Sequence, residues 1–225
     1  NLDDVLEDES SRGVLLQRKA AYLEFAKRFA PACHAPDKPE LQRLAWTHRE
    51  RARGIAVNIV GFDTALLAAG DDDAKKLRIG QAQLALLKDC APERDFVVVL
   101  GHHPFNKEWL HPDEEREAAT QVRRRAHVYL AGHVHEHDSV RLVSGGGPEV
   151  VHVVAGALYG GRQEHVPNGH AYSIGALVPA FAEKPVRLRI YPRRFSFRNG
   201  DFRMDVDSVL EGKTYAEFEL PRLRG

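Results

Sequence analysis

The sequence of 225 residues has no excess charge of either sign and contains little cysteine. Lysine and arginine together number 32, and aspartate and glutamate together also number 32. A chain without a net charge does not recruit nucleic acid or an anionic membrane through its overall field, so a local site must bind any such partner. The two cysteines, Cys33 and Cys90, match no metal or redox spacing. They predict two buried thiols in a reducing compartment.

Long apolar runs are also absent from the sequence. No stretch of about 18 apolar residues occurs, although a membrane-spanning helix needs one. The first residues lack the basic and then apolar pattern of an export signal. We therefore expect a cytoplasmic protein with no membrane partner. The chain opens on Asn1 rather than methionine, as a fragment or a processed form would.

The sequence does contain enough apolar residues for one globular domain. Hydrophobic residues make up 43% of the chain and charged residues 28%. A chain of this length and composition can bury a substantial core. We predict a single domain over residues 1–225, with a helical segment at 1–54, an α/β half at 55–137 and a mostly β half at 138–225.

The helical segment is predicted to contain two helices. Apolar residues at helical spacing predict an amphipathic helix over residues 10–32. A proline at its start and a glycine at its end predict a second helix from Pro39 to Gly54. The β-branched run at residues 55–62 then predicts a strand.

Helices and strands alternate in the next part of the chain. The apolar patterns predict helices at 81–92 and 113–126, and strands at 95–101 and 127–132. This alternation predicts a parallel sheet covered by helices, in which ligands bind beyond the carboxyl ends of the strands. After residue 138, short strands between glycine and proline clusters predict a second, antiparallel sheet that packs on the first.

Two histidine clusters follow two of the predicted parallel strands. His102 and His103 follow one strand, and His133 and His135 follow the next. Imidazole binds borderline divalent ions at neutral pH, and alternation with period two points His133 and His135 the same way. The alternative is a set of hydrogen-bonded core histidines. Two clusters at the carboxyl edge of one sheet favour a metal site, whereas His137 lies in a polar stretch and is predicted to be a surface residue.

A glycine precedes the first histidine of each cluster. A glycine at this place lets the backbone turn tightly, so that the following ring can face a site. We therefore expect Gly132 to form the turn that presents His133.

These segments resemble a known family. The segment VVVLGHHPF and the later segment VYLAGHVHEHD resemble the C-terminal half of the calcineurin-like metallophosphoesterases, which include bacterial phosphodiesterases, purple acid phosphatases and DNA-repair nucleases. The flanking segments VGFDTALLAAG, VVAGALYGG and HAYSIGAL are similar to bacterial members. The resemblance covers roughly residues 55–195. It implies an α/β/β/α sandwich of two packed mixed sheets flanked by helices, incomplete at the N-terminus.

The resemblance also implies a dinuclear metal centre with two divalent ions, either Mn, Fe or Zn. His102 and His133 would bind one ion, His135 would bind the other, and His103 would be a catalytic residue beside the substrate. In the family a hydroxide that bridges the two ions attacks phosphorus, while the metals hold the phosphate oxygens. The implied activity is hydrolysis of a phosphate ester, and we expect a phosphodiesterase that acts on a nucleotide or another phosphodiester.

The N-terminal metal motifs of the family are missing from this sequence. The family carries Asp-x-His, then Gly-Asp with a bridging aspartate, then Gly-Asn-His followed by an acid, and none occurs in its expected place. Three histidines cannot hold two divalent ions, because each ion needs about four donors. Three explanations remain open. The missing half lies upstream, a second chain supplies it, or the protein is a degenerate member that acts as a non-catalytic binding or regulatory module.

A nuclease is the weaker alternative. Arg193, Arg194 and Arg198 lie among Phe195 and Phe197, a mixture that can hold a nucleotide backbone and stack on bases. The same mixture also occurs on an amphipathic pair of strands with solvated arginines. We favour the strand pair and keep nucleic acid as an alternative partner.

Overall fold

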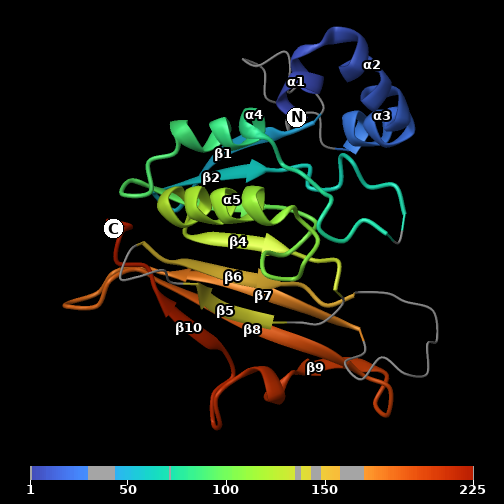
Figure 1. Ribbon diagram of the computed structural model, residues 1–225. Coiled ribbons are helices and arrows are strands. Elements are labelled where there is room, and N and C mark those ends of the chain that lie inside the picture. Colours follow the sequence, from blue (N-terminus) through green and yellow to red (C-terminus); the bar gives the residue numbers. More distant parts are fainter. Residues whose placement is uncertain are drawn as a thin grey trace.

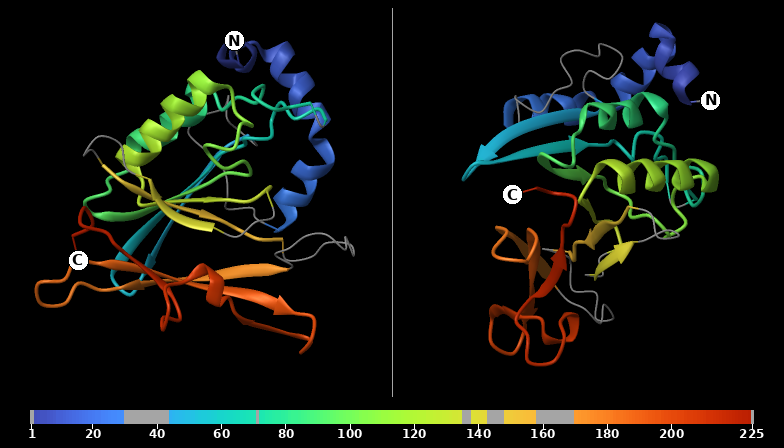
Figure 2. Two further views of the ribbon diagram at one scale, coloured as in Figure 1. Left: turned by 60° about the horizontal axis from the view of Figure 1, so that its bottom comes forward. Right: turned by 90° about the vertical axis from the view of Figure 1, so that its left-hand side faces the viewer.

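The computed structural model describes residues 2–29, 44–70, 72–134, 138–142, 148–157 and 170–224, with the backbone alone for 138–142. Within these residues two β-sheets pack face to face, and helices cover the other face of the first sheet (Figures 1 and 2). This arrangement confirms the predicted α/β class, with two packed sheets and flanking helices. None of the described helices is long and apolar enough to cross a membrane.

The first sheet has six strands in the order β1-β2-β3-β4-β6-β5. Their bounds are β1 Trp46–Ala52, β2 Ile55–Gly61, β3 Asp95–Leu100, β4 Val128–Ala131, β5 Asp138–Leu142 and β6 Val150–Val154. The four inner strands β2, β3, β4 and β6 run parallel, and β1 and β5 are antiparallel edge strands. Parallel strands covered on both faces need continuous apolar runs, as in β3 and β6. The predicted parallel sheet is therefore confirmed.

The strand β1 replaces part of a predicted helix. The prediction of a helix from Pro39 to Gly54 is wrong over Trp46–Ala52, and its residues up to 43 lie outside the described residues. β1 and β2 pair in register around a two-residue turn, in which Arg53 and Gly54 have φ values of 50° and 87°. Two positive φ angles are typical of the turn that closes a β-hairpin. The glycine predicted to end a helix therefore closes a hairpin.

The second sheet has the strand order β10-β8-β7, and β9 pairs with β8. Its strands are β7 Ala171–Val178, β8 Arg187–Ser196, β9 Asp201–Met204 and β10 Ala216–Glu219. All of these pairings are antiparallel, as predicted for this part of the chain. The prediction that every strand after residue 138 joins the second sheet is wrong for β5 and β6, because both extend the first sheet and β6 pairs parallel to β4. A short 3₁₀ helix η3, Val206–Ser208, follows β9.

The helices include two that cover the first sheet. These are α4, Gln81–Leu84, which continues as the 3₁₀ helix η2, Ala85–Asp89, and α5, Pro112–Arg125. Acidic residues in the first turn of α5 and arginines in its last turn complement the helix dipole. The predicted helix at residues 10–32 is instead two helices, α2 Glu9–Arg18 and α3 Ala20–Phe29, preceded by α1 Leu2–Glu7.

The core has two layers, one on each face of the first sheet. Along β3, Val97 and Val99 pack with the helices, whereas Phe96 and Val98 pack with the second sheet. This alternation follows from the period of two in a strand. A third, smaller cluster joins the N-terminal helices to the loops before β1 and after β2, through Leu2, Leu6, Leu15, Leu44 and Leu66.

The first helix also caps a helix that lies far away in the sequence. Helix α4 begins after Gly80, which has no side chain to accept a bond from the first turn. Asp3 supplies the missing acceptor, because its Oδ1 accepts the Ala82 N–H at 3.0 Å. A side chain on Gly80 would bring its Cβ to 2.9 Å from Asp3 Oδ1. This contact fixes α1 against the body of the domain.

His127 is a buried histidine at the start of β4 that lies apart from the two clusters. Burial, followed by the nearby charge of Arg222, lowers the pKa of His127 from 6.5 to about 4. The ring is therefore neutral at pH 7, and its Nδ1 accepts the Val97 N–H at 3.1 Å. Between pH 6.5 and 4 the unfolded chain binds more protons at this position than the folded protein does. Stability is consequently lost as the pH falls through this window.

Replacing His127 with asparagine should remove part of this pH dependence, because the asparagine Oδ1 can accept the same bond and does not titrate. Between pH 7 and pH 5.5 the wild-type protein should lose about 1 kcal/mol more of its free energy of unfolding than His127→Asn. Urea unfolding at both pH values measures the difference. An equal loss in both proteins would contradict a neutral, buried His127.

Candidate metal centre

Three of the predicted site residues lie together at the carboxyl ends of β3 and β4. His102, His103 and His133 each offer a ligand atom, and these atoms all lie within 4.8 Å of one another. His102 Nε2 and His133 Nδ1 are 3.0 Å apart. His103 is buried, and the other two side chains are more accessible. The predicted ligand His135 and the predicted surface residue His137 lie outside the described residues.

The register of the parallel strands brings these loops together. Leu100 of β3 pairs with Leu130 of β4. Cross-strand bonding then continues beyond the strand ends, because Gly101 N donates to the Leu130 carbonyl and Gly132 N donates to the His102 carbonyl, each at 3.0 Å. The residues that follow each strand are therefore held side by side.

His133 itself forms the turn that presents its ring. Its φ is 68°, and Val134 N donates to the Gly132 carbonyl at 2.8 Å, across His133. A three-residue turn with a positive central φ is rare and strained for a residue with a side chain. The turn was predicted at the preceding glycine. Gly132, however, has no left-handed φ, and a Cβ there would lie 4.0 Å from its nearest neighbour.

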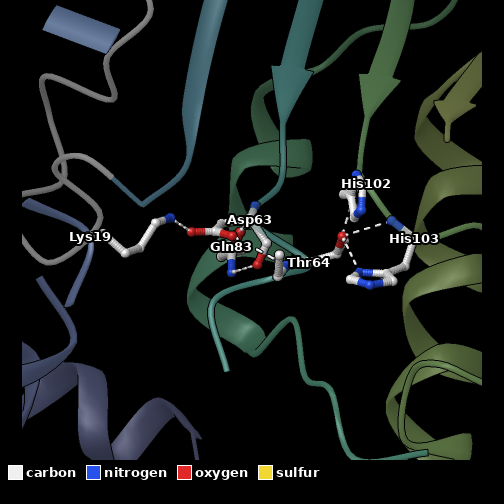
Figure 3. A network of polar contacts seen from close by, with 7 residues as sticks. Lys19, Asp63, Thr64, Gln83, His102 and His103 are labelled. Atoms are coloured by element: carbon white, nitrogen blue, oxygen red, sulfur yellow. Dashed lines mark hydrogen bonds and ion pairs between the residues drawn. The ribbon is translucent and has the colours of Figure 1, made fainter. Parts of the chain in front are cut away.

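A threonine hydroxyl holds the first histidine loop. Thr64 Oγ1 accepts the backbone N–H groups of His102 and His103, each at 3.0 Å, and lies 3.1 Å from His103 Nδ1 (Figure 3). Thr64 is 1% exposed, so water does not compete for these bonds. Because both acceptor positions of the hydroxyl are used, its proton is free to be donated to His103 Nδ1. In that arrangement His103 would carry its own proton on Nε2.

His103 is held in the neutral form by its surroundings. Burial, and then the neighbouring His102 and His133 rings, lower the pKa of His103 to about 4. At neutral pH the ring therefore has one acceptor nitrogen and one N–H donor. Nδ1 faces the Thr64 hydroxyl, and Nε2 lies on the other side of the ring.

Tyr129 supports the same loop from the core. Its hydroxyl donates to the His103 carbonyl at 2.6 Å, and its ring stacks on Phe105 with centroids 4.3 Å apart. A Cβ on Gly101 would lie 2.3 Å from this hydroxyl oxygen. Gly101 is thus needed because a residue without a side chain leaves room for the Tyr129 hydroxyl.

Two further contacts complete the surroundings of the cluster. The ring of Trp109 lies edge-on to His133, with centroids 4.2 Å apart. On the other side, Asp63 next to Thr64 forms an ion pair with Lys19 of the α2–α3 junction (Figure 3). Burial lowers the pKa of Lys19 to about 8. The N–H of Asp63 also donates to Gln83 Oε1 at 2.8 Å.

Sequence reasoning missed these supporting residues, since single threonines, tyrosines and tryptophans carry no spacing signal. A signal for Thr64 did exist, because it lies in the segment VGFDT, which is similar to the family. No pattern in the sequence pointed to Trp109 or to Lys19.

The geometry of the cluster fits one divalent ion. Two imidazole nitrogens that bind one tetrahedral Zn²⁺ at about 2.0–2.1 Å lie roughly 3.3 Å apart. The separation of 3.0 Å between His102 Nε2 and His133 Nδ1 is close to this value. No carboxylate of the described residues joins the group. The part of the chain that the structure describes thus supplies nitrogen donors and no bridging oxygen.

Residues 36–137 match the family model of the calcineurin-like phosphoesterases. The match includes both β3 and β4 and the histidine loops that follow them, and it confirms the family that the histidine motifs predicted. Over these residues the chain is thus similar to the calcineurin-like phosphoesterases. Members of that family generally bind divalent metals and act on phosphate esters.

Two solved structures show a more distant similarity. The GAP50 anchor in the inner membrane complex of Plasmodium is 14% identical, with a TM-score of 0.36 over 80% of this chain and 56% of that chain. A hypothetical protein from Thermus thermophilus is 17% identical, with a TM-score of 0.34 over 71% of this chain and 60% of that chain. The chain therefore spans a little over half of the length of these proteins. No curated protein matches the sequence.

Thr64→Val should loosen the metal centre, because it removes the acceptor of one buried and one partly buried N–H group. Each unpaired buried group costs about 1–3 kcal/mol, so the free energy of unfolding should fall by about 3 kcal/mol. The affinity for Zn²⁺ should fall as well. Urea unfolding and zinc titration measure the two effects.

The matched control is Thr64→Ser, which keeps the hydroxyl and should keep most of the stability and most of the zinc affinity. Valine keeps the methyl group and lacks the hydroxyl, so equal stability and equal zinc affinity of the valine and serine variants would mean that the hydrogen bonds of Thr64 contribute nothing. The hydroxyl would then have no supporting role.

Proposed function

We propose that the protein is a metal-dependent phosphodiesterase in which His102 and His133 bind one divalent ion and His103 contacts the substrate. The observation that carries this proposal is the approach of His102 Nε2 to His133 Nδ1 at 3.0 Å, at the carboxyl ends of two neighbouring parallel strands. The family match over residues 36–137 supports the reaction class.

The two ligand histidines differ in how they are held. The backbone of His102 is fixed on one side by Thr64 and on the other by the N–H of Gly132. His133 is fixed by its own turn and by the edge of Trp109. Ligands that are held in place before the ion binds lose little entropy on binding it. When bound, a divalent ion at this position would polarise a phosphate oxygen and lower the pKa of a water molecule.

His103 contributes a hydrogen-bond donor to the site. Its Nδ1 faces the Thr64 hydroxyl, and its neutral form leaves a proton on Nε2. A neutral N–H donor can bind a phosphate oxygen. Because it carries no charge, it does not repel the metal ion as a protonated ring would. We propose that this proton stabilises the negative charge that develops on the phosphate oxygens.

A second ion would need more donors than the described residues supply. We propose His135 as a ligand of that ion, together with carboxylate and amide groups that lie outside the described residues. Mn, Fe and Zn all suit such a set of ligands, because imidazole and carboxylate accept each of them.

The second candidate function is a non-catalytic binding or regulatory module. It is favoured by the absence of a carboxylate from the histidine group within the described residues. Such a module would bind one ion or none and would not hydrolyse phosphate esters. Metal content and turnover together separate the two candidates.

His102→Ala and His133→Ala should each lower the affinity for Zn²⁺ or Mn²⁺ by at least about tenfold, because each removes a direct ligand. Hydrolysis of bis(p-nitrophenyl) phosphate should fall in the same variants to the level of metal-free protein. Metal analysis after dialysis and a colorimetric assay measure the two effects.

The control is His48→Ala, since His48 lies on the edge strand β1, far along the chain from the cluster. It should bind metal and hydrolyse the ester as the wild-type protein does. Metal affinity that stays unchanged in His102→Ala would refute the ligand assignment. Metal binding with no turnover in the wild-type protein would favour the non-catalytic module.

A further inference from the structure

A large cavity lies beside the metal centre, between helix α3 and the carboxyl ends of β2 and β3. Its volume is about 980 Å³, and its wall includes Gly101 and His102 of the candidate site. Pockets for small organic ligands are typically about 300–1,000 Å³. The cavity therefore has the size and the position to hold the group that is esterified to a phosphate at His102.

Aromatic side chains contribute much of the wall. Tyr22 of α3, Trp46 of β1 and Phe62 after β2 all line the cavity. The indole of Trp46 lies directly against the backbone of Gly61, where a Cβ would come within 2.2 Å of the ring. Tyr22 is 60% exposed, so its ring is accessible from solvent. Lys19 Nζ lies over one face of the Tyr22 ring, 5.4 Å from the centroid, which leaves the other face for a ligand.

The charges of the wall favour an anionic ligand. Its cations are Arg18, Lys19 and Lys27, and its acids are Glu24 and Asp63. Lys19 is already paired with Asp63, and the Arg18 guanidinium donates to a backbone carbonyl. Lys27 makes no ion pair with any of the described residues. The lining thus combines aromatic faces with a lysine that is available to an anion.

We propose that this cavity binds the aromatic group of a phosphate ester of nucleoside size, with Tyr22 as the stacking residue and Lys27 as a cation that attracts the phosphate. The position of the phosphate at His102 rests on the function proposed above. Stacking of a base on an aromatic side chain strengthens binding by about tenfold or more. An ester that lacks the aromatic group would present the same phosphate but would lose this contribution.

A pair of ligands with the same phosphate tests the proposal. Isothermal titration should show that adenosine 5′-monophosphate binds the zinc-loaded protein at least about tenfold more tightly than ribose 5-phosphate does. Tyr22→Ala should abolish this preference. Equal affinities of the two ligands for the wild-type protein would overturn the proposal.

The same helix offers matched controls. Phe25 is 59% exposed and does not line the cavity, so Phe25→Ala should keep the preference for the base. Lys27→Gln should weaken both ligands by a similar factor, whereas Arg28→Gln, outside the cavity, should weaken neither. If Phe25→Ala acted like Tyr22→Ala, the effect would belong to helix α3 as a whole, and the assigned cavity would be wrong.

The outcome also separates this inference from the proposed function. The protein could prefer the base through Tyr22 and yet hydrolyse no diester. This result would support the proposed cavity and reject the phosphodiesterase function. The protein could instead hydrolyse a diester through His102 and show no preference for the base. This result would support the phosphodiesterase function and reject the proposed cavity. Thermal unfolding of each variant verifies that the exposed positions on α3 leave the fold intact.

Discussion

The candidate metal centre depends on the parallel pairing of β3 and β4 and on its continuation past the strand ends. The Gly132 N–H donates to the His102 carbonyl, so one loop is bonded directly to the other. Thr64, after the neighbouring strand β2, bonds the same loop from the opposite side. Three adjacent strands thus fix one cluster. The placement of the three rings depends on the whole sheet, because no short segment could hold them together alone.

Burial gives the histidines of this domain their chemical character. His103 and His127 both have a pKa near 4, and in both burial is the largest cause. They differ in position, because His127 accepts a backbone bond inside the sheet while His103 stands beside the other two rings of the cluster. Neutral imidazole is the form that binds metals or donates a single hydrogen bond. The fold therefore prepares His103 for such a role at neutral pH.

The N-terminal helices make the surroundings of the cluster asymmetric. The ion pair of Lys19 with Asp63 joins the α2–α3 junction to the residue before Thr64. This contact places α3 along one side of the site and leaves a cavity between the helix and the sheet. A helix that looked from the sequence like one continuous amphipathic element is thus interrupted where it contributes to the site.

By itself, the sequence determined the parallel run of β2, β3 and β4, the antiparallel pairing of β7 to β10 and the resemblance to the family, because apolar periodicity and the two histidine motifs are local signals. It did not assign β5 and β6 to the first sheet, because the choice of sheet depends on the partner strand. It failed at β1, where Gly54 suited the end of a helix as well as a hairpin turn, and the partner strand decided between them. The contacts of Thr64, Tyr129 and Trp109 were decided only by the tertiary structure. Each contact joins residues that are distant in sequence and are brought together by strand register and packing. The hydrophobic pattern of the sequence does not specify such contacts.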